Sequence, residues 1–111
     1  MAAYTEIYLE QYADYSTKIN LSDNQGGNIN LSNYTASSQM RKSYYSSTAA
    51  SFNVAISNAS TGELTVSMSS AATGNLTPGR YVYDVVIRDS SNVATRVVEG
   101  IAVVLPGVTH A

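Results

Sequence analysis

The sequence predicts an all-β protein, built as a single antiparallel β-sandwich of about seven strands. Three observations carry this prediction: apolar and polar residues alternate in several short runs, turn residues recur roughly every 8 to 12 positions, and no segment keeps a helical period for long. At 111 residues the chain suits one domain over residues 1–111, with short tails at about 1–4 and 107–111.

The first half of the chain is predicted to hold three strands joined by polar segments. In each strand apolar side chains alternate with polar ones, which is the period of a β-strand with one buried face. A turn cluster with two glycines, residues 23–28, separates the second strand from the third, and a polar loop is expected at residues 41–48. The three runs are residues 6–10, 15–21 and 34–40.

Two further alternating runs, residues 52–56 and 64–68, flank a turn at residues 58–62. This pattern predicts two further strands with a turn between them. Residues 69–76 are predicted to form one helical turn, because the segment is short and Gly74 weakens any longer helix.

The clearest element is a β-hairpin between Leu76 and Pro106. The pair Pro78-Gly79 marks its start, because Pro fixes φ and Gly accepts the positive φ that many turns need. Residues 81–88 then alternate, a polar break follows at residues 90–92, and the alternation resumes up to the end of the hairpin.

The last strand of this hairpin is apolar on both faces. Val98, Gly100, Ala102 and Val104 share one face, and Val97, Glu99, Ile101 and Val103 share the other. Two explanations fit this pattern. A bulge near Gly100 would change which face is buried, or the strand is covered on both sides, by the core and by a partner.

Composition excludes several classes of protein. The net charge is −2 and the isoelectric point is near 5.1, which argues against a surface that binds nucleic acid. Charged residues make up only 13% of the chain, about half of average usage, and such a hydroxyl- and amide-rich surface suits an extracellular or particle-bound protein. We expect no membrane span, because no apolar run approaches about 20 residues, and no signal peptide, because Glu6 and Glu10 interrupt the first residues.

The sequence contains no constellation of residues for catalysis, for a cofactor or for a metal ion. The chain has no cysteine, and its one histidine, His110, lies in the terminal tail, where nothing orients a base. Asp84 and Asp89 flank a strand and are expected to be surface or turn residues. Residues 23–28 lack the acidic spacing of a calcium loop and are expected to form a plain turn. We therefore expect no enzymatic activity, no cofactor and no metal site.

Tyrosine supplies nearly all the aromatic surface, with nine Tyr, one Phe and no Trp. Tyr is favoured at interfaces because it offers apolar area and a hydroxyl together. Tyr8 and Tyr12 lie near the N-terminal edge and Tyr44 and Tyr45 lie in a polar loop; the alternative for each is a ring half-buried at a strand edge. The candidate interface residues are Tyr8, Tyr12, Tyr44, Tyr45, Val97, Val98, Ile101, Val103 and Val104.

The order of these features resembles small structural proteins of tailed bacteriophages. The most specific part is LTPGRYVYD at residues 76–84, followed by RVVEG at residues 96–100; NLSNYT at residues 30–35 is a second matching element. The resemblance covers nearly the whole chain. It implies an immunoglobulin-like β-sandwich related to the N-terminal domain of upper baseplate proteins, and it supplies no catalytic residues.

The sequence thus favours a non-enzymatic structural protein of the virion, made in the host cytoplasm. We expect it to dock on other phage structural proteins at the tail, baseplate or neck, or as a capsid decoration protein, in multiple copies in a symmetric assembly, without binding nucleic acid or a membrane. Strand edges, exposed Tyr and the outer face of the last hairpin are the expected contacts. The alternative is a carbohydrate-binding or host-surface adhesion module with Tyr44 and Tyr45 as stacking platforms.

Overall fold

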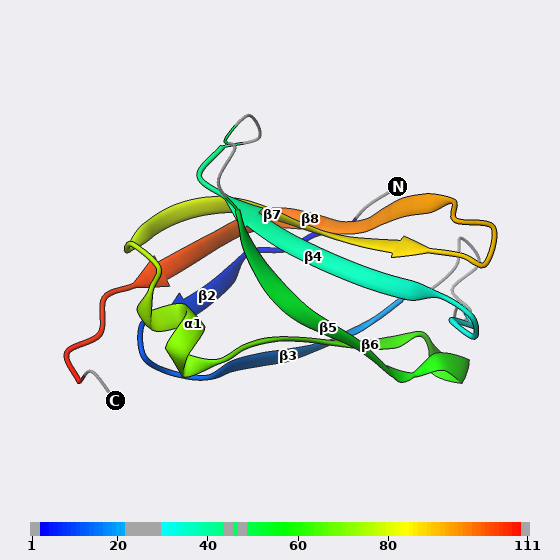
Figure 1. The fold of residues 1–111 in the computed structure, drawn as a ribbon, viewed down its shortest axis with the longest axis horizontal. Helices are drawn as coiled ribbons and strands as arrows, with labels where there is room; N and C mark the ends of the chain where they lie inside the picture. The colour runs from blue at the N-terminus through cyan, green and yellow to red at the C-terminus, as the bar shows by residue number, and fades with distance from the viewer. Residues whose placement is uncertain (1–2, 22–29, 44–45, 47–48, 110–111) are drawn as a thin grey trace.

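The all-β prediction is confirmed in the computed structural model, which describes residues 3–21, 30–43, 46 and 49–109 (Figure 1). The described part of the chain forms eight strands, a single 3-10 turn at Ala59–Thr61 and one short helix, α1, at Ser70–Gly74. The strands are β1 (Ala3–Tyr4), β2 (Ile7–Glu10), β3 (Tyr15–Asn20), β4 (Thr35–Arg41), β5 (Ala50–Asn58), β6 (Glu63–Met68), β7 (Gly79–Arg88) and β8 (Ala94–Leu105).

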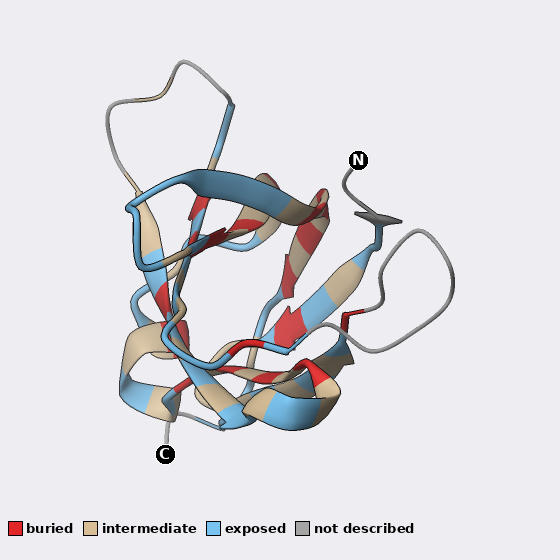
Figure 2. Ribbon diagram, turned by 90° about the vertical axis from the view of Figure 1, so that its right-hand side faces the viewer, coloured by how far each residue is buried: buried red, intermediate tan, exposed pale blue. Residues whose placement is uncertain are grey.

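These strands form one mixed sheet that curls into a near-barrel (Figure 2). The strand order is β1-β8-β7-β4-β5-β6-β3, and β2 also pairs with β8. The long strand β5 joins the two halves of the sheet, because Ala50–Phe52 pair with β4 while Asn53–Asn58 pair with β6. The prediction of a purely antiparallel arrangement is wrong, since β1 and β2 run parallel to β8.

The predicted hairpin is confirmed as β7 and β8. Its register runs from Gly79 opposite Val104 to Arg88 opposite Ala94. The turn between the strands is closed by the Asp89 carboxylate, which accepts hydrogen bonds from the amides of Ser91 and Val93, both at 2.9 Å. Asp89 is therefore a turn residue, as expected.

The bulge in β8 lies at Val97 and not near Gly100. Val85 pairs with Val98 and Val86 pairs with Arg96, so Val97 is the extra residue. Beyond this bulge β8 keeps one face buried up to Val104. The expected change of face at Gly100 does not occur.

Gly100 has a different role, which is to let the N-terminal segment approach β8. A Cβ atom at this position would lie 1.8 Å from the carbonyl oxygen of Thr5. The same oxygen accepts a hydrogen bond of 2.8 Å from the hydroxyl of Tyr83, which is paired with Gly100 across β7 and β8. Burial raises the pKa of Tyr83 to about 12.

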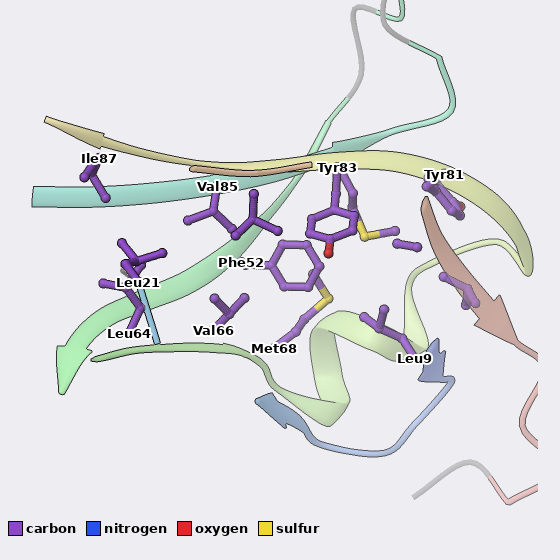
Figure 3. Close-up of a cluster of buried hydrophobic side chains, with 14 of the residues drawn as sticks. Leu9, Leu21, Phe52, Leu64, Val66, Met68, Tyr81, Tyr83, Val85 and Ile87 are labelled. Atoms are coloured by element: carbon purple, nitrogen blue, oxygen red, sulfur yellow. The ribbon is translucent and has the colours of Figure 1, made fainter. Parts of the chain in front are cut away.

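One hydrophobic core fills the inside of the curled sheet (Figure 3). Phe52 lies at its centre, with its ring centroid 6.2 Å from that of Tyr15 and 6.3 Å from that of Tyr83. Because β5 carries Phe52 where the strand passes between the two halves, this ring ties them together. The buried apolar residues are Leu9, Leu21, Leu31, Met40, Phe52, Leu64, Val66, Met68, Tyr81, Tyr83, Val85, Ile87, Val98, Ala102 and Val104.

Helix α1 is the predicted single helical turn, and the turn between β2 and β3 holds it in place. Ser69 caps the helix by accepting from the Ala72 amide, and the Asp14 carboxylate accepts from the Ser70 amide at 2.7 Å. The hydroxyl of the buried Thr73 donates to the carbonyl of Ala13 at 2.9 Å.

The Gln11 side chain joins the same turn to the end of β8. Its amide nitrogen donates to the Leu76 carbonyl at 2.7 Å, and its amide oxygen accepts from the Gly107 amide at 3.0 Å. The Gln11 backbone amide donates to the Leu105 carbonyl at 3.0 Å.

Candidate functional site

The most distinctive surface of the described chain is the outer face of β2, β8, β7 and β4. Along these strands buried residues alternate with more exposed ones (Figure 2). Because successive side chains of a strand point to opposite faces, those of the more exposed residues point away from the core. We define the outer face as Glu6, Tyr8, Gln39, Arg41, Arg80, Val82, Asp84, Glu99, Ile101 and Val103.

The central row of the outer face has an acid at one end and a base at the other. Val82 of β7 pairs with Ile101 of β8 on one side and with Arg41 of β4 on the other. Glu6 lies between β1 and β2. Tyr4 of β1 pairs with Glu99 and Ile7 of β2 pairs with Ala102, so the same register places Glu6 level with Ile101. The row therefore reads carboxylate, two apolar side chains, guanidinium.

A second row combines aromatic, apolar and basic side chains. Val103 pairs with Tyr8 on one side and with Arg80 on the other. Tyr8 is 56% exposed, and its hydroxyl donates a hydrogen bond to the Glu6 carboxylate. This hydrogen bond and the charge of Glu6 raise the pKa of Tyr8, whereas the positive charge of Arg80 lowers it. Tyr8 of the second row therefore interacts directly with Glu6 of the central row.

A third row is acidic. Asp84 pairs directly with Glu99, and two like charges opposite each other are unfavourable. Arg96 relieves this at Asp84, with its Nε 3.3 Å from the carboxylate. Both side chains are exposed enough for water to screen the pair. Among the described residues Glu99 takes part in no salt bridge.

The third row borders a hollow of about 270 Å³. Arg41 is fixed at its rim by hydrogen bonds to the Gln39 side chain at 3.0 Å and to the Ser46 carbonyl at 2.7 Å. The hollow is lined by Gln39, Arg41, Val82, Tyr83, Asp84, Arg96 and Glu99.

No group of three or more His, Cys, Asp or Glu side chains gathers as a metal-binding cluster within the described residues. Within the same residues, no helix has the length and apolar character needed to cross a membrane.

The candidate interface residues fall into separate places. Tyr8, Ile101 and Val103 lie on the outer face, and Val97 lies at the bulge, partly exposed and packed against the core. Tyr44 and Tyr45 lie outside the described residues, as do His110 and the turn predicted at residues 23–28.

Val98 and Val104 must be withdrawn from the candidate surface. They are 3% and 2% exposed and belong to the core, because β8 presents one constant face to the inside after its bulge. Tyr12 is half-buried, and its ring would lie 2.7 Å from a Cβ atom on Gly74 and 3.1 Å from one on Gly107. Its surroundings indicate a packing role at the turn between β2 and β3.

Of the outer face, sequence reasoning named Tyr8, Ile101 and Val103 as interface residues and missed the other seven members, which are Glu6, Gln39, Arg41, Arg80, Val82, Asp84 and Glu99. Arg80 and Val82 alternate with the buried Tyr81 and Tyr83, so the period of β7 contained the signal for them. Glu6 and Arg41 join the face only through the pairing of β1, β2 and β4 with their neighbours.

No protein-family model matches this chain, and no curated protein matches it.

Proposed function

We propose that this protein is a non-enzymatic structural protein of a tailed-bacteriophage virion, which docks on other virion proteins through its outer face. The observation that carries the proposal is the apolar centre of that face. Val82, Ile101 and Val103 are only half-buried there, although side chains on a free sheet face are usually polar. A partner that covers these side chains would remove their apolar surface from water.

The link to phage proteins rests on the resemblance of residues 76–84 and 96–100. These residues form much of β7 and β8, the strands at the centre of the outer face. The segments that carry the resemblance therefore also supply part of the proposed contact surface, namely Arg80, Val82, Asp84 and Glu99.

We further propose that the curled sheet is an immunoglobulin-like sandwich. In that fold one sheet contains neighbouring strands C, F and G and the other contains B, E and D. Here β4, β7 and β8 are neighbours, as are β3, β6 and β5, which gives the same two sets in the same chain order. The Tyr81 hydroxyl also donates to the Thr77 carbonyl at 2.7 Å, near the start of β7, as the tyrosine corner of such domains does near the start of strand F.

The direct test is mass spectrometry of purified particles of the source phage. We expect the protein in stoichiometric amounts; its absence from intact particles would overturn the proposal.

A matched pair of variants tests the contact surface. Val103→Lys places a charge on the outer face and should prevent incorporation into particles. Val93→Lys makes the same change at an exposed valine in the turn between β7 and β8, and should be incorporated normally. Normal incorporation of Val103→Lys would show that docking uses another surface.

A carbohydrate-binding or adhesion module is the second candidate, and the polar hollow favours it. Gln39, Arg41 and Glu99 offer amide, guanidinium and carboxylate groups, which form hydrogen bonds to sugar hydroxyls. A glycan array should then show binding that Gln39→Ala reduces. Binding no greater than that of an unrelated control protein would exclude this candidate.

A further inference from the structure

The acidic and basic side chains of the central row lie at opposite ends of it. If a second copy of this row is turned end to end, each charge faces the opposite charge. In the central row Glu6 lies at one side and Arg41 at the other, with Ile101 and Val82 between them. Neither Glu6 nor Arg41 forms a salt bridge within the described residues, where one such pair, Arg96 with Asp84, is found. Such a row fits a second row that runs in the opposite direction.

We propose that the partner on the outer face is a second copy of this chain. A two-fold axis that runs along the strands, midway between β7 and β8, reverses the strand order and leaves each row at its own level. Glu6 then faces Arg41 of the second copy, and Ile101 faces Val82 of the second copy, each contact occurring twice. A two-fold axis across the strands would instead place like charges opposite each other, so the charges select the first arrangement.

The neighbouring rows show where this contact is tight and where it is open. Val103 faces Arg80 of the second copy, whose hydrocarbon stem can cover an apolar side chain while its charge reaches water. In the third row Glu99 faces Asp84 of the second copy, which is unfavourable. This row borders the hollow, so there is room for water between the carboxylates of the two copies. The contact is therefore centred on Ile101, Val82 and Val103.

The size of the face makes the dimer a weak one. Strands lie about 4.8 Å apart and rise about 3.3 Å per residue, so four strands over six residues cover roughly 20 Å by 20 Å. Two such faces bury an area at the low end for specific interfaces. Weak contacts of this kind become effective in a repeated assembly, where neighbours hold the copies at high local concentration.

This inference rests on the proposed function in using the same face, but its test needs only the purified chain. Sedimentation equilibrium over a wide range of concentrations should show a monomer–dimer equilibrium. Glu6→Lys and Arg41→Glu should each weaken the dimer about tenfold or more, because each places like charges together twice. An equimolar mixture of the two variants should restore association, since both charge pairs are then attractive. Lys18→Glu on the exposed face of β3 makes the same charge change as Arg41→Glu and should have no effect.

A variant that strengthens the dimer provides a second test, because a misfolded variant would not bind its second copy more tightly. Glu99→Gln removes a carboxylate that faces Asp84 of the second copy, and should tighten the dimer. A chain that is monomeric at every concentration would overturn the proposal, as would a dimer that is indifferent to these changes or a mixture that fails to associate. A monomeric chain that is still found in phage particles would overturn only the dimer, whereas a dimer absent from particles would overturn only the proposed function.

Discussion

The two halves of the curled sheet present different outer faces. On β3, β6 and β5 the outward side chains are polar apart from Ala55, and some bond to one another: the Ser57 hydroxyl donates to the Glu63 carboxylate at 2.8 Å and accepts from Thr65 at 3.0 Å. On β8 and β7 the corresponding positions hold Ile101 and Val82. Both halves cover the same core, so burying the inner face does not require an apolar outer face. The proposed contact outside the chain would account for the valines and isoleucine of the second half.

The largest effect should come from the residue that unites the two halves. Phe52→Ala removes the ring between Tyr15 and Tyr83, and should lower the free energy of unfolding by about 3–5 kcal/mol. Urea denaturation followed by circular dichroism measures this loss. If the two halves instead unfolded in separate steps, the idea of one shared core would be wrong.

A smaller effect is expected where the N-terminal segment lies against Gly100 of β8. Gly100→Ala forces a Cβ atom onto the Thr5 carbonyl, which must shift, at a cost of about 1–3 kcal/mol. Hydrogen exchange should show β1 opening while β3 stays protected. Unchanged protection of β1 would contradict the close approach of these segments.

The Tyr83 hydroxyl should contribute about 1 kcal/mol through its hydrogen bond to Thr5, which Tyr83→Phe removes. The phenol ionises near pH 10 in the unfolded chain and near pH 12 in the folded protein. The unfolded chain therefore loses its proton first, so the contribution is complete below pH 10 and is lost between pH 10 and about 12. Denaturation curves of both proteins over this range measure it. If the free energy of unfolding fell equally steeply with pH in the wild-type protein and in Tyr83→Phe, Tyr83 would not be the cause of the loss.

The smallest effect on folding is expected on the outer face itself. Val82→Thr keeps a β-branched side chain and should change the free energy of unfolding by about 0.5 kcal/mol or less, yet weaken dimer formation. Thr65→Val makes the reverse change in the polar half and should leave association unaltered. If Val82→Thr destabilised the monomer as much as a core substitution, the apolar outer side chains would be needed for folding.

Periodicity in the sequence was sufficient to predict most strands, because alternation follows directly from one buried face. The strands at residues 15–21, 34–40 and 64–68 and the long hairpin were predicted in this way and are confirmed. The pairing of the strands with one another could not be predicted in this way. Nothing in the alternation of Ile7 and Leu9 indicates that β2 lies parallel to β8, since pairing depends on the path of the whole chain.

Two other features show the same limit. Gly100 signalled an irregularity, but a bulge and a close approach of backbone use glycine for different reasons, and only the position of Thr5 distinguishes them. Tyr12 adopts a φ of 66°, which is unusual for an aromatic residue. Its ring lies against Gly74 and Gly107, which are far away in sequence.

The candidate site was predictable only in part. Ile101 and Val103 follow from the second apolar face of the last strand, but the opposing charges at Glu6 and Arg41 become visible only when the registers are known. Val98 and Val104 were assigned to the surface because the side on which β8 is buried depends on the bulge at Val97.

The hydrogen bonds of Gln11 have a practical consequence for labelling. They join Gly107 to the turn between β2 and β3, beside α1. A fluorophore attached to a Val108→Cys variant, at the exposed residue next to Gly107, therefore has a defined attachment point at the α1 end of the molecule (Figure 1). Such an attachment gives a fixed reference from which distances to a partner on the outer face can be measured by energy transfer.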